Sequence, residues 1–174
     1  MSMMIKFVRF NIYLWLALGL VWLTGCQTSK DKDKKVTTLE LHLEINADGG
    51  KDNETVPIFR EHPMYITVDR EPIVDTPDVA HAEVVEALGG FSLRVHFNWR
   101  GTQLLASTTQ ANRGKRIGIL VDFPEPRWIA APMIRKSITD GILTFTPDCS
   151  REEADRIVKG LNDVAEEIKK SDKL

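Results

Sequence analysis

The first 26 residues constrain this chain more than any other segment. Lys6 and Arg9 are the only charged residues among them. They precede an apolar run, residues 10–23, that only Asn11 and Gly19 interrupt. A positive segment followed by an apolar run of this length is typical of a secretory signal helix. The run is shorter than the roughly 20 residues that cross a bilayer as a helix. The sequence therefore predicts that the rest of the chain leaves the cytoplasm.

The end of the apolar run indicates which kind of signal this is. Leu23, Thr24, Gly25 and Cys26 follow one another. This tetrad resembles the lipobox of bacterial lipoproteins, whose cysteine is acylated, typically with palmitate, and becomes the first residue after cleavage. Small residues fit before the cleaved bond because the peptidase must approach the backbone closely. The alternative is an uncleaved anchor with an incidental cysteine. Both interpretations place the following domain outside the cytoplasm and on a membrane.

The residue after the cysteine bears on which membrane that is. In lipoproteins of double-membrane bacteria, the signal for retention in the inner membrane is usually an aspartate at this position. Here the residue is Gln27. If the cell has two membranes, the resemblance therefore favours the outer membrane over the inner one.

Cleavage before Cys26 changes the composition that matters for folding. Removing 25 of the 174 residues leaves 149, and losing Lys6 and Arg9 changes the formal net charge from −2 to −4. This length suits one domain. A mildly acidic chain lacks the basic stripe of a nucleic-acid-binding protein, so no nucleic acid is expected as a partner. With Cys26 lipidated, Cys149 has no cysteine to pair with, and the core must hold the fold without a disulfide.

The remaining sequence divides into a tether and a folded domain. Residues 27–35 (QTSKDKDKK) are polar and rich in charge, which is typical of a flexible linker. We therefore assign residues 1–25 to a signal peptide, 26–36 to the lipidated cysteine and tether, and 37–170 to the domain.

Alternation of apolar and polar residues predicts several strands in this domain. Apolar residues occupy every second position of residues 39–45 and 91–97, which is the period of a strand with one buried face. Gly89-Gly90 indicates a hairpin turn before the second of these. Further extended segments are expected at residues 56–59, 64–68, 117–121 and 142–146.

Two segments have helical periodicity. Residues 99–113 carry apolar residues at helical spacing and end before Gly114, a typical C-cap. The last helix is expected to begin at the capping box formed by Ser150 and Glu153. Its apolar face comprises Ala154, Ile157, Val158, Leu161, Val164, Ala165 and Ile168. The pattern predicts an α+β fold in which two amphipathic helices pack on one face of a mostly antiparallel sheet.

The C-terminal part of the domain resembles the periplasmic head subdomain of the protein-export component SecD. The resemblance covers roughly residues 55–165, and its specific motifs lie between residues 112 and 161. The shared residues are Asn112, Gly114-Lys115-Arg116, the apolar strand 117–121 with Asp122, Ala131-Pro132-Met133-Ile134, Ile138, Gly141, Phe145-Thr146 and Glu152-Glu153-Ala154. The resemblance implies a compact α+β head that contacts protein chains emerging across the inner membrane.

The chain departs from that family at two loops and after its last helix. Residues 123–128 (FPEPRW) stand where the family has a tight Asp-Gly turn, and residues 147–149 replace a glycine-rich approach to the last helix. No transmembrane bundle follows in this sequence. We therefore expect a head that binds without the family's proton-coupled motor.

Four histidines raise the question of a metal site. His42 and His96 fall on the polar positions of alternating strands, and Glu40 and Glu44 flank His42. A His/Glu site forms there only if those strands are neighbours, and no HxxxH or CxxC spacing supports one. His62 and His81 have no ligand spacing either. We therefore expect no metal and no other cofactor.

Two other side chains are candidates for a functional role. Cys149 precedes the last helix, whose dipole lowers the pKa of a nearby thiol, but no base is adjacent to it in sequence, so an inert thiol is expected. Trp128, with Pro124 and Pro126, is a candidate contact for a partner protein. The alternative is a tryptophan folded back on the core.

No catalytic constellation is recognisable in the sequence. It contains no glycine-rich phosphate loop and no Ser-His-Asp arrangement in a known context. We therefore predict a lipid-anchored, extracytoplasmic module of the cell envelope that is not an enzyme and binds protein or peptide, with protein export as the process that the resemblance implies. The alternative is a structural envelope lipoprotein that docks onto a membrane complex or the cell wall.

Overall fold

The computed structural model describes residues 36–46 and 52–171. The predicted signal segment with Leu23, Thr24, Gly25 and Cys26 lies outside the described residues, as do residues 27–35 of the tether. The chain divides into two units, residues 1–34 and 35–174, and all described residues belong to the second. In the described ranges, no helix combines the length and the apolar character that a membrane span requires.

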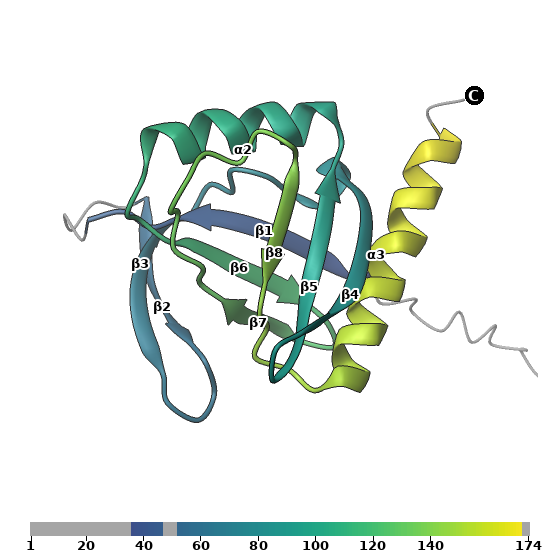
Figure 1. The fold of residues 1–174 in the computed structure, drawn as a ribbon, viewed down its shortest axis with the longest axis horizontal. Coiled ribbons are helices and arrows are strands. Elements are labelled where there is room, and N and C mark those ends of the chain that lie inside the picture. Colours follow the sequence, from purple (N-terminus) through teal and green to yellow (C-terminus); the bar gives the residue numbers. More distant parts are fainter. Residues whose placement is uncertain (1–35, 47–51, 172–174) are drawn as a thin grey trace, which may run out of the picture. The chain divides into compact units, whose positions relative to one another are not determined.

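The described strands form three antiparallel sheets (Figure 1). The first sheet has the order β1 (Thr38–Leu43), β6 (Ile117–Asp122), β7 (Pro126–Ala130). The second is the hairpin of β2 (Asn53–Ile58) and β3 (Met64–Asp69). The third has the order β4 (Val79–Ala87), β5 (Gly90–Phe97), β8 (Ile142–Phe145). The predicted hairpin at Gly89-Gly90 is the β4–β5 turn, where Gly89 has a φ of +82°.

Two α-helices pack against these strands, α2 (Trp99–Ala111) and α3 (Arg151–Ser171). The side chain of Asn98 caps α2 by accepting a hydrogen bond of 2.9 Å from the Gly101 N–H. Ser150 caps α3, because its hydroxyl accepts from the Glu153 N–H at 3.2 Å. In Figure 1, α3 runs along β4, and its buried residues come from the predicted apolar face. The α+β fold with antiparallel strands and two packed helices is confirmed, with the strands divided among three sheets.

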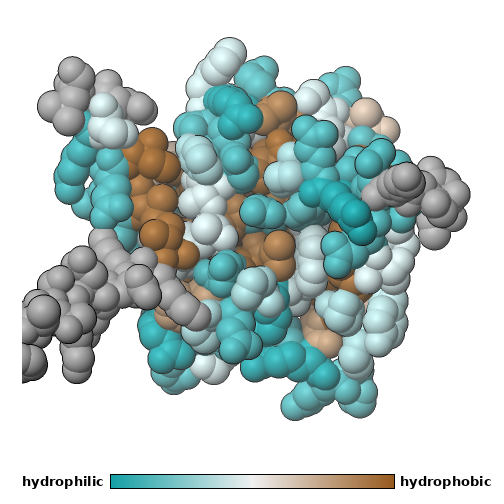
Figure 2. Space-filling model, turned by 180° about the vertical axis from the view of Figure 1, so that it is seen from behind, coloured by the Kyte–Doolittle hydropathy of each residue, from teal (hydrophilic) through white to brown (hydrophobic). Residues whose placement is uncertain are grey.

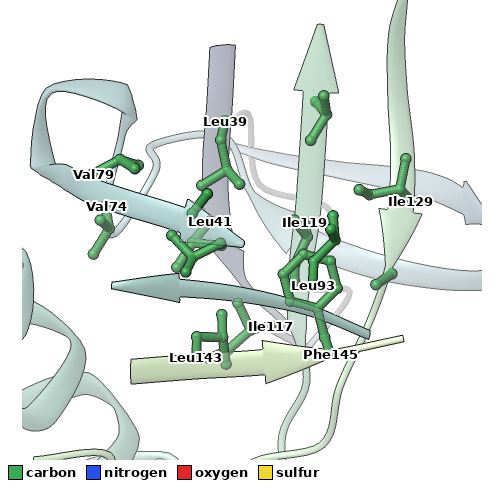
Figure 3. Close-up of a cluster of buried hydrophobic side chains, with 14 of the residues drawn as sticks. Leu39, Leu41, Val74, Val79, Leu93, Ile117, Ile119, Ile129, Leu143 and Phe145 are labelled. Atoms are coloured by element: carbon green, nitrogen blue, oxygen red, sulfur yellow. The ribbon is translucent and has the colours of Figure 1, made fainter. Parts of the chain in front are cut away.

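The main core lies between the first and third sheets (Figure 3). The alternation of the sequence accounts for it, because Leu39 and Leu41 of β1 and Ile117 and Ile119 of β6 are at most 1% exposed. α3 adds residues from its apolar face to the same cluster. Figure 2 shows one face of the molecule, on which hydrophobic residues form short patches between hydrophilic ones.

A second, smaller cluster lies beneath the β2–β3 hairpin. Its buried members are Val56, Ile58, Ile66, Val68 and Ala131, and the side chains of Met64 and Trp128 pack against it. The hairpin therefore has its own apolar contacts with the segment around β7 and does not rely on the main core.

Candidate functional site

A cavity of about 460 Å³ lies between β8 and the segment that precedes it, residues 132–140. Figure 1 shows this segment as the coil between β7 and β8. Ile117 of β6, Ile134 and Leu143 give the cavity a buried apolar lining. Arg135 and Lys136 are exposed at its polar rim. The size and the mixed lining are typical of a site that takes a ligand of several residues or a small molecule. We call this cavity the β8 groove.

The wall of the β8 groove is fixed to other elements at its start and middle. The Ile134 N–H donates to the Lys115 carbonyl oxygen at 2.8 Å, beside the start of β6. The Ile138 N–H donates to the hydroxyl of Thr109 in α2 at 2.9 Å, and Thr109 is fully buried. Because these backbone groups bond to β6 and α2, the wall stands apart from β8.

The end of the wall is fixed by Gly141, immediately before β8. The Phe97 N–H donates to the Gly141 carbonyl oxygen at 2.9 Å, which fixes the residue after the wall to β5. Gly141 has a φ of +68°, a conformation that glycine adopts at little cost. A Cβ atom at this position would collide with the side chain of Thr102 in α2. The entry into β8 therefore depends on a glycine.

The two edge strands of the third sheet differ in what bonds to their outward backbone groups. At the β4 edge, the side-chain amide of Asn162 in α3 accepts from the Ala82 N–H at 2.8 Å and donates to the Ala82 carbonyl oxygen at 2.9 Å. Asn162 thus occupies the bonding groups that another strand would use. α3 therefore covers this edge at Ala82.

The opposite edge, at β8, is open. Along an antiparallel strand, every second residue directs its backbone N–H and C=O toward a given neighbouring strand. The Phe97–Gly141 bond shows which residues of β8 direct these groups toward β5. Leu143 and Phe145 therefore bond to β5, whereas the backbone groups of Ile142 and Thr144 point away from it. The Asp140 side chain accepts from the Ile142 N–H at 3.1 Å. Within the described ranges, no residue bonds to the Ile142 carbonyl or to either backbone group of Thr144.

Several positions on the edges of the other two sheets are bonded or blocked. On β1, the Leu41 N–H donates to the Val74 carbonyl oxygen at 2.9 Å, and on β7 the Ile129 carbonyl oxygen accepts from the Asp148 N–H at 2.7 Å. On β2, Pro57 stands at an outward position and has no N–H to offer. Among the described edges, β8 therefore combines open backbone groups with an adjacent cavity.

The structure places the predicted contact Trp128 against the second cluster. Its ring lies over Gly118, where a Cβ atom would approach Trp128 Cζ3 to 2.9 Å. It also meets the ring of His42 edge-on at 5.0 Å between centroids. The half-buried Trp128 thus adopts the folded-back alternative. Pro124 and Pro126 are exposed, and a partner contact there stays a prediction.

The strands that carry His42 and His96 are not neighbours, so the condition for a joint His/Glu site is not met. His42 is buried on β1, with Nδ1 2.8 Å from the Asp69 carbonyl oxygen and Nε2 3.2 Å from Glu40 Oε2. His96 lies on β5 in another sheet, where its ring centroid is 5.9 Å from that of His81. The described residues contain no cluster of three or more His, Cys, Asp or Glu that could hold a metal ion.

Cys149 lies beside a charged cluster that sequence reasoning missed. Arg127 bonds to the carboxylate of Glu153, and Arg60 Nε lies 3.4 Å from Asp148 Oδ2. The cluster joins the β2–β3 loop, β7 and the start of α3. Its members are far apart in sequence, so no local pattern reveals it. Burial, followed by the Glu153 charge, raises the pKa of the Cys149 thiol to about 11.

We expect Cys149 to react slowly with thiol reagents. A pKa of about 11 instead of 9.0 lowers the thiolate fraction at about pH 8 by roughly 100-fold, and the thiolate is the nucleophile. In the C26S variant, which leaves one cysteine, labelling of the folded protein should therefore be about 100-fold slower than that of free cysteine. Denaturant should restore the ordinary rate. Labelling of the folded protein as fast as free cysteine would contradict the burial seen here.

The chain belongs to a known family. The sequence profile of the SecDF P1 head subdomain matches residues 51–164, and the chain is a member of that family. The predicted resemblance to the SecD head is thereby confirmed. In SecDF, this subdomain is an extracytoplasmic part of a protein-export component, so the family is one of protein transport.

Two solved structures of SecDF share the fold. One, described as a membrane component that enhances protein export, is 23% identical with a TM-score of 0.53. The match covers 72% of this chain and 62% of the chain in that structure. The other is SecDF in the super-membrane-facing form, which is 24% identical with a TM-score of 0.53. The match covers 72% of this chain and 18% of the SecDF chain. The chain thus spans less than two thirds of the length of either. A comparison with the curated proteins gives no match.

Proposed function

We propose that this protein is a non-catalytic, lipid-anchored extracytoplasmic module that binds polypeptide segments in the β8 groove, in connection with protein export. The observation that carries the proposal is the open edge of β8 beside an apolar cavity of about 460 Å³. Membership of a family that occurs in an export component supports the choice of an unfolded polypeptide as the ligand.

The lining of the groove supports binding rather than catalysis. Its titratable side chains are Arg135, Lys136 and Asp140, and no imidazole or thiol stands among the lining residues. Apolar side chains of a polypeptide fit against the Ile117, Ile134 and Leu143 lining, while its backbone stays near the polar rim. The Ser137 hydroxyl donates to the Ala106 carbonyl oxygen at 3.4 Å, and no imidazole stands among the lining residues to activate it as a nucleophile.

The lipid anchor is proposed from Cys26 and the preceding residues Leu23, Thr24 and Gly25. Acylation would hold the domain at the surface of a membrane, with residues 27–35 as the spacer. Gln27 supports the outer membrane as the destination in a cell with two membranes. An anchored binder of this kind would meet exported chains after they leave the inner membrane.

A photo-crosslinker in intact cells tests the proposal. It is placed at Met133, which lines the groove and is 46% exposed, and in a control variant at Leu88, which is fully exposed at the β4–β5 turn. We expect unfolded exported proteins to be captured from position 133 and not from position 88. Capture of one stable envelope complex instead would support the structural alternative, and no capture at position 133 would contradict the proposal.

A further inference from the structure

We infer that the polypeptide in the β8 groove binds as an added strand, pairing with β8 as the fourth strand of the third sheet. This inference rests on the proposed function and specifies its binding mode. Ile142 and Thr144 are separated by one residue, so their outward groups recur at about 6.8 Å along the edge, the repeat of two residues in an extended chain. An extended polypeptide presents its own N–H and C=O groups at the same repeat.

The contrast between the two edges of the third sheet supports this mode. An open edge strand is a template for pairing with another chain, and folded proteins usually cover such edges. The β4 edge is capped at Ala82, where Asn162 bonds to both backbone groups. The β8 edge has no such cover among the described residues, and it opens into a cavity.

The cavity beside β8 is where an added strand would lie. Paired strands lie about 4.7–4.9 Å apart, so the strand would occupy the space between β8 and the wall. Ile134 and Ile138 bond to Lys115 and Thr109, which keeps the wall on β6 and α2. The wall therefore has no need of bonds to β8, and its position is set before any ligand arrives.

The charge at the rim of the β8 groove indicates which class of polypeptide binds there. Arg135 and Lys136 are exposed on the wall, and no acidic residue of the described ranges forms an ion pair with either. The occupant we infer is an extended segment with alternating apolar side chains and an acidic flank that meets these two cations. A proline at a position facing Thr144 would remove the N–H that pairs with β8.

Backbone methylation of a peptide tests strand addition without altering the protein. The probe is a fluorescent octapeptide of alternating valine and threonine with glutamates at one end. It is compared with two N-methylated versions. One carries methyl groups on the backbone nitrogens of the odd-numbered residues, and the other on those of the even-numbered residues. We expect one set of methyl groups to weaken binding by at least about tenfold and the other to leave it nearly unchanged. Equal effects of both sets would overturn strand addition while leaving groove binding intact.

Failure of all three peptides to bind would instead contradict the proposed function itself. Charge reversal at the rim, R135E together with K136E, should weaken binding of the acidic peptide. It should strengthen binding of a version with lysines in place of the glutamates. An unchanged preference would overturn the inferred ligand class.

Amide exchange provides a second readout on the protein itself. The Thr144 N–H should exchange quickly in the free protein and become protected when the peptide is added, whereas Leu143 and Phe145 should be protected in both states. Unchanged exchange at Thr144 in the presence of bound peptide would overturn the inference. Protection of Thr144 without peptide, together with a dimer in sedimentation, would show that a second copy of this chain occupies the edge instead.

Discussion

The variant G141A should lose roughly 2–5 kcal/mol of its free energy of unfolding. Two physical costs add at this position. A φ of +68° costs a residue with a Cβ atom about 1–2 kcal/mol. The added atom also meets the side chain of Thr102 in α2, and such overpacking costs about 1–3 kcal/mol. Urea denaturation of the wild type and the variant measures the difference.

Gly114 provides a matched control for this prediction. It also has a positive φ, of +87°, but nothing lies within 4 Å of the position where its Cβ would be. G114A should therefore show only the conformational cost, about 1–2 kcal/mol. Equal destabilisation by G114A and G141A would show that the contact between Thr102 and the entry of β8 is not tight. Because Gly141 sets the phase of β8, G141A should also weaken peptide binding in the groove.

The second large effect is expected outside the described residues. Replacing Cys26 by serine should abolish the incorporation of palmitate into the protein. Serine cannot form the thioether through which the lipid is attached. Metabolic labelling with palmitate in cells that express each form measures this loss.

The other cysteine is the control for this experiment. C149S should retain the label, because Cys149 is half-buried within the folded domain. If the wild type incorporates no palmitate, the uncleaved-anchor interpretation of residues 10–23 is favoured. The mass of the N-terminal peptide then distinguishes an intact signal from a processed one.

The fold can be understood from the sequence where local periodicity is strong. Leu39 and Leu41 alternate with polar residues and become buried positions of β1. The apolar face from Ala154 to Ala165 becomes the buried side of α3. Residues 79–87 mix helix-favouring and strand-favouring residues. They form β4 because β5 pairs with them on one side and α3 covers the other.

The candidate site could not be predicted from local periodicity. The β8 groove combines a residue of β6, an irregular segment and β8. Thr144 lies in a strand that the sequence predicts, yet nothing in the sequence distinguishes its open edge from the covered edge at Ala82. The charged cluster of Arg60, Arg127 and Glu153 likewise joins residues that only the fold brings together.

The sequence by itself determined the class of fold, the family resemblance and the expected lipid anchor at Cys26. These depend on local order along the chain: the period of a strand or helix, or a short motif read in one stretch. The tertiary structure alone decided that Trp128 packs inward and that β8 is left open beside a cavity. Whether a strand edge is covered depends on which distant element reaches it, as Asn162 reaches Ala82, and that is a property of the assembled chain.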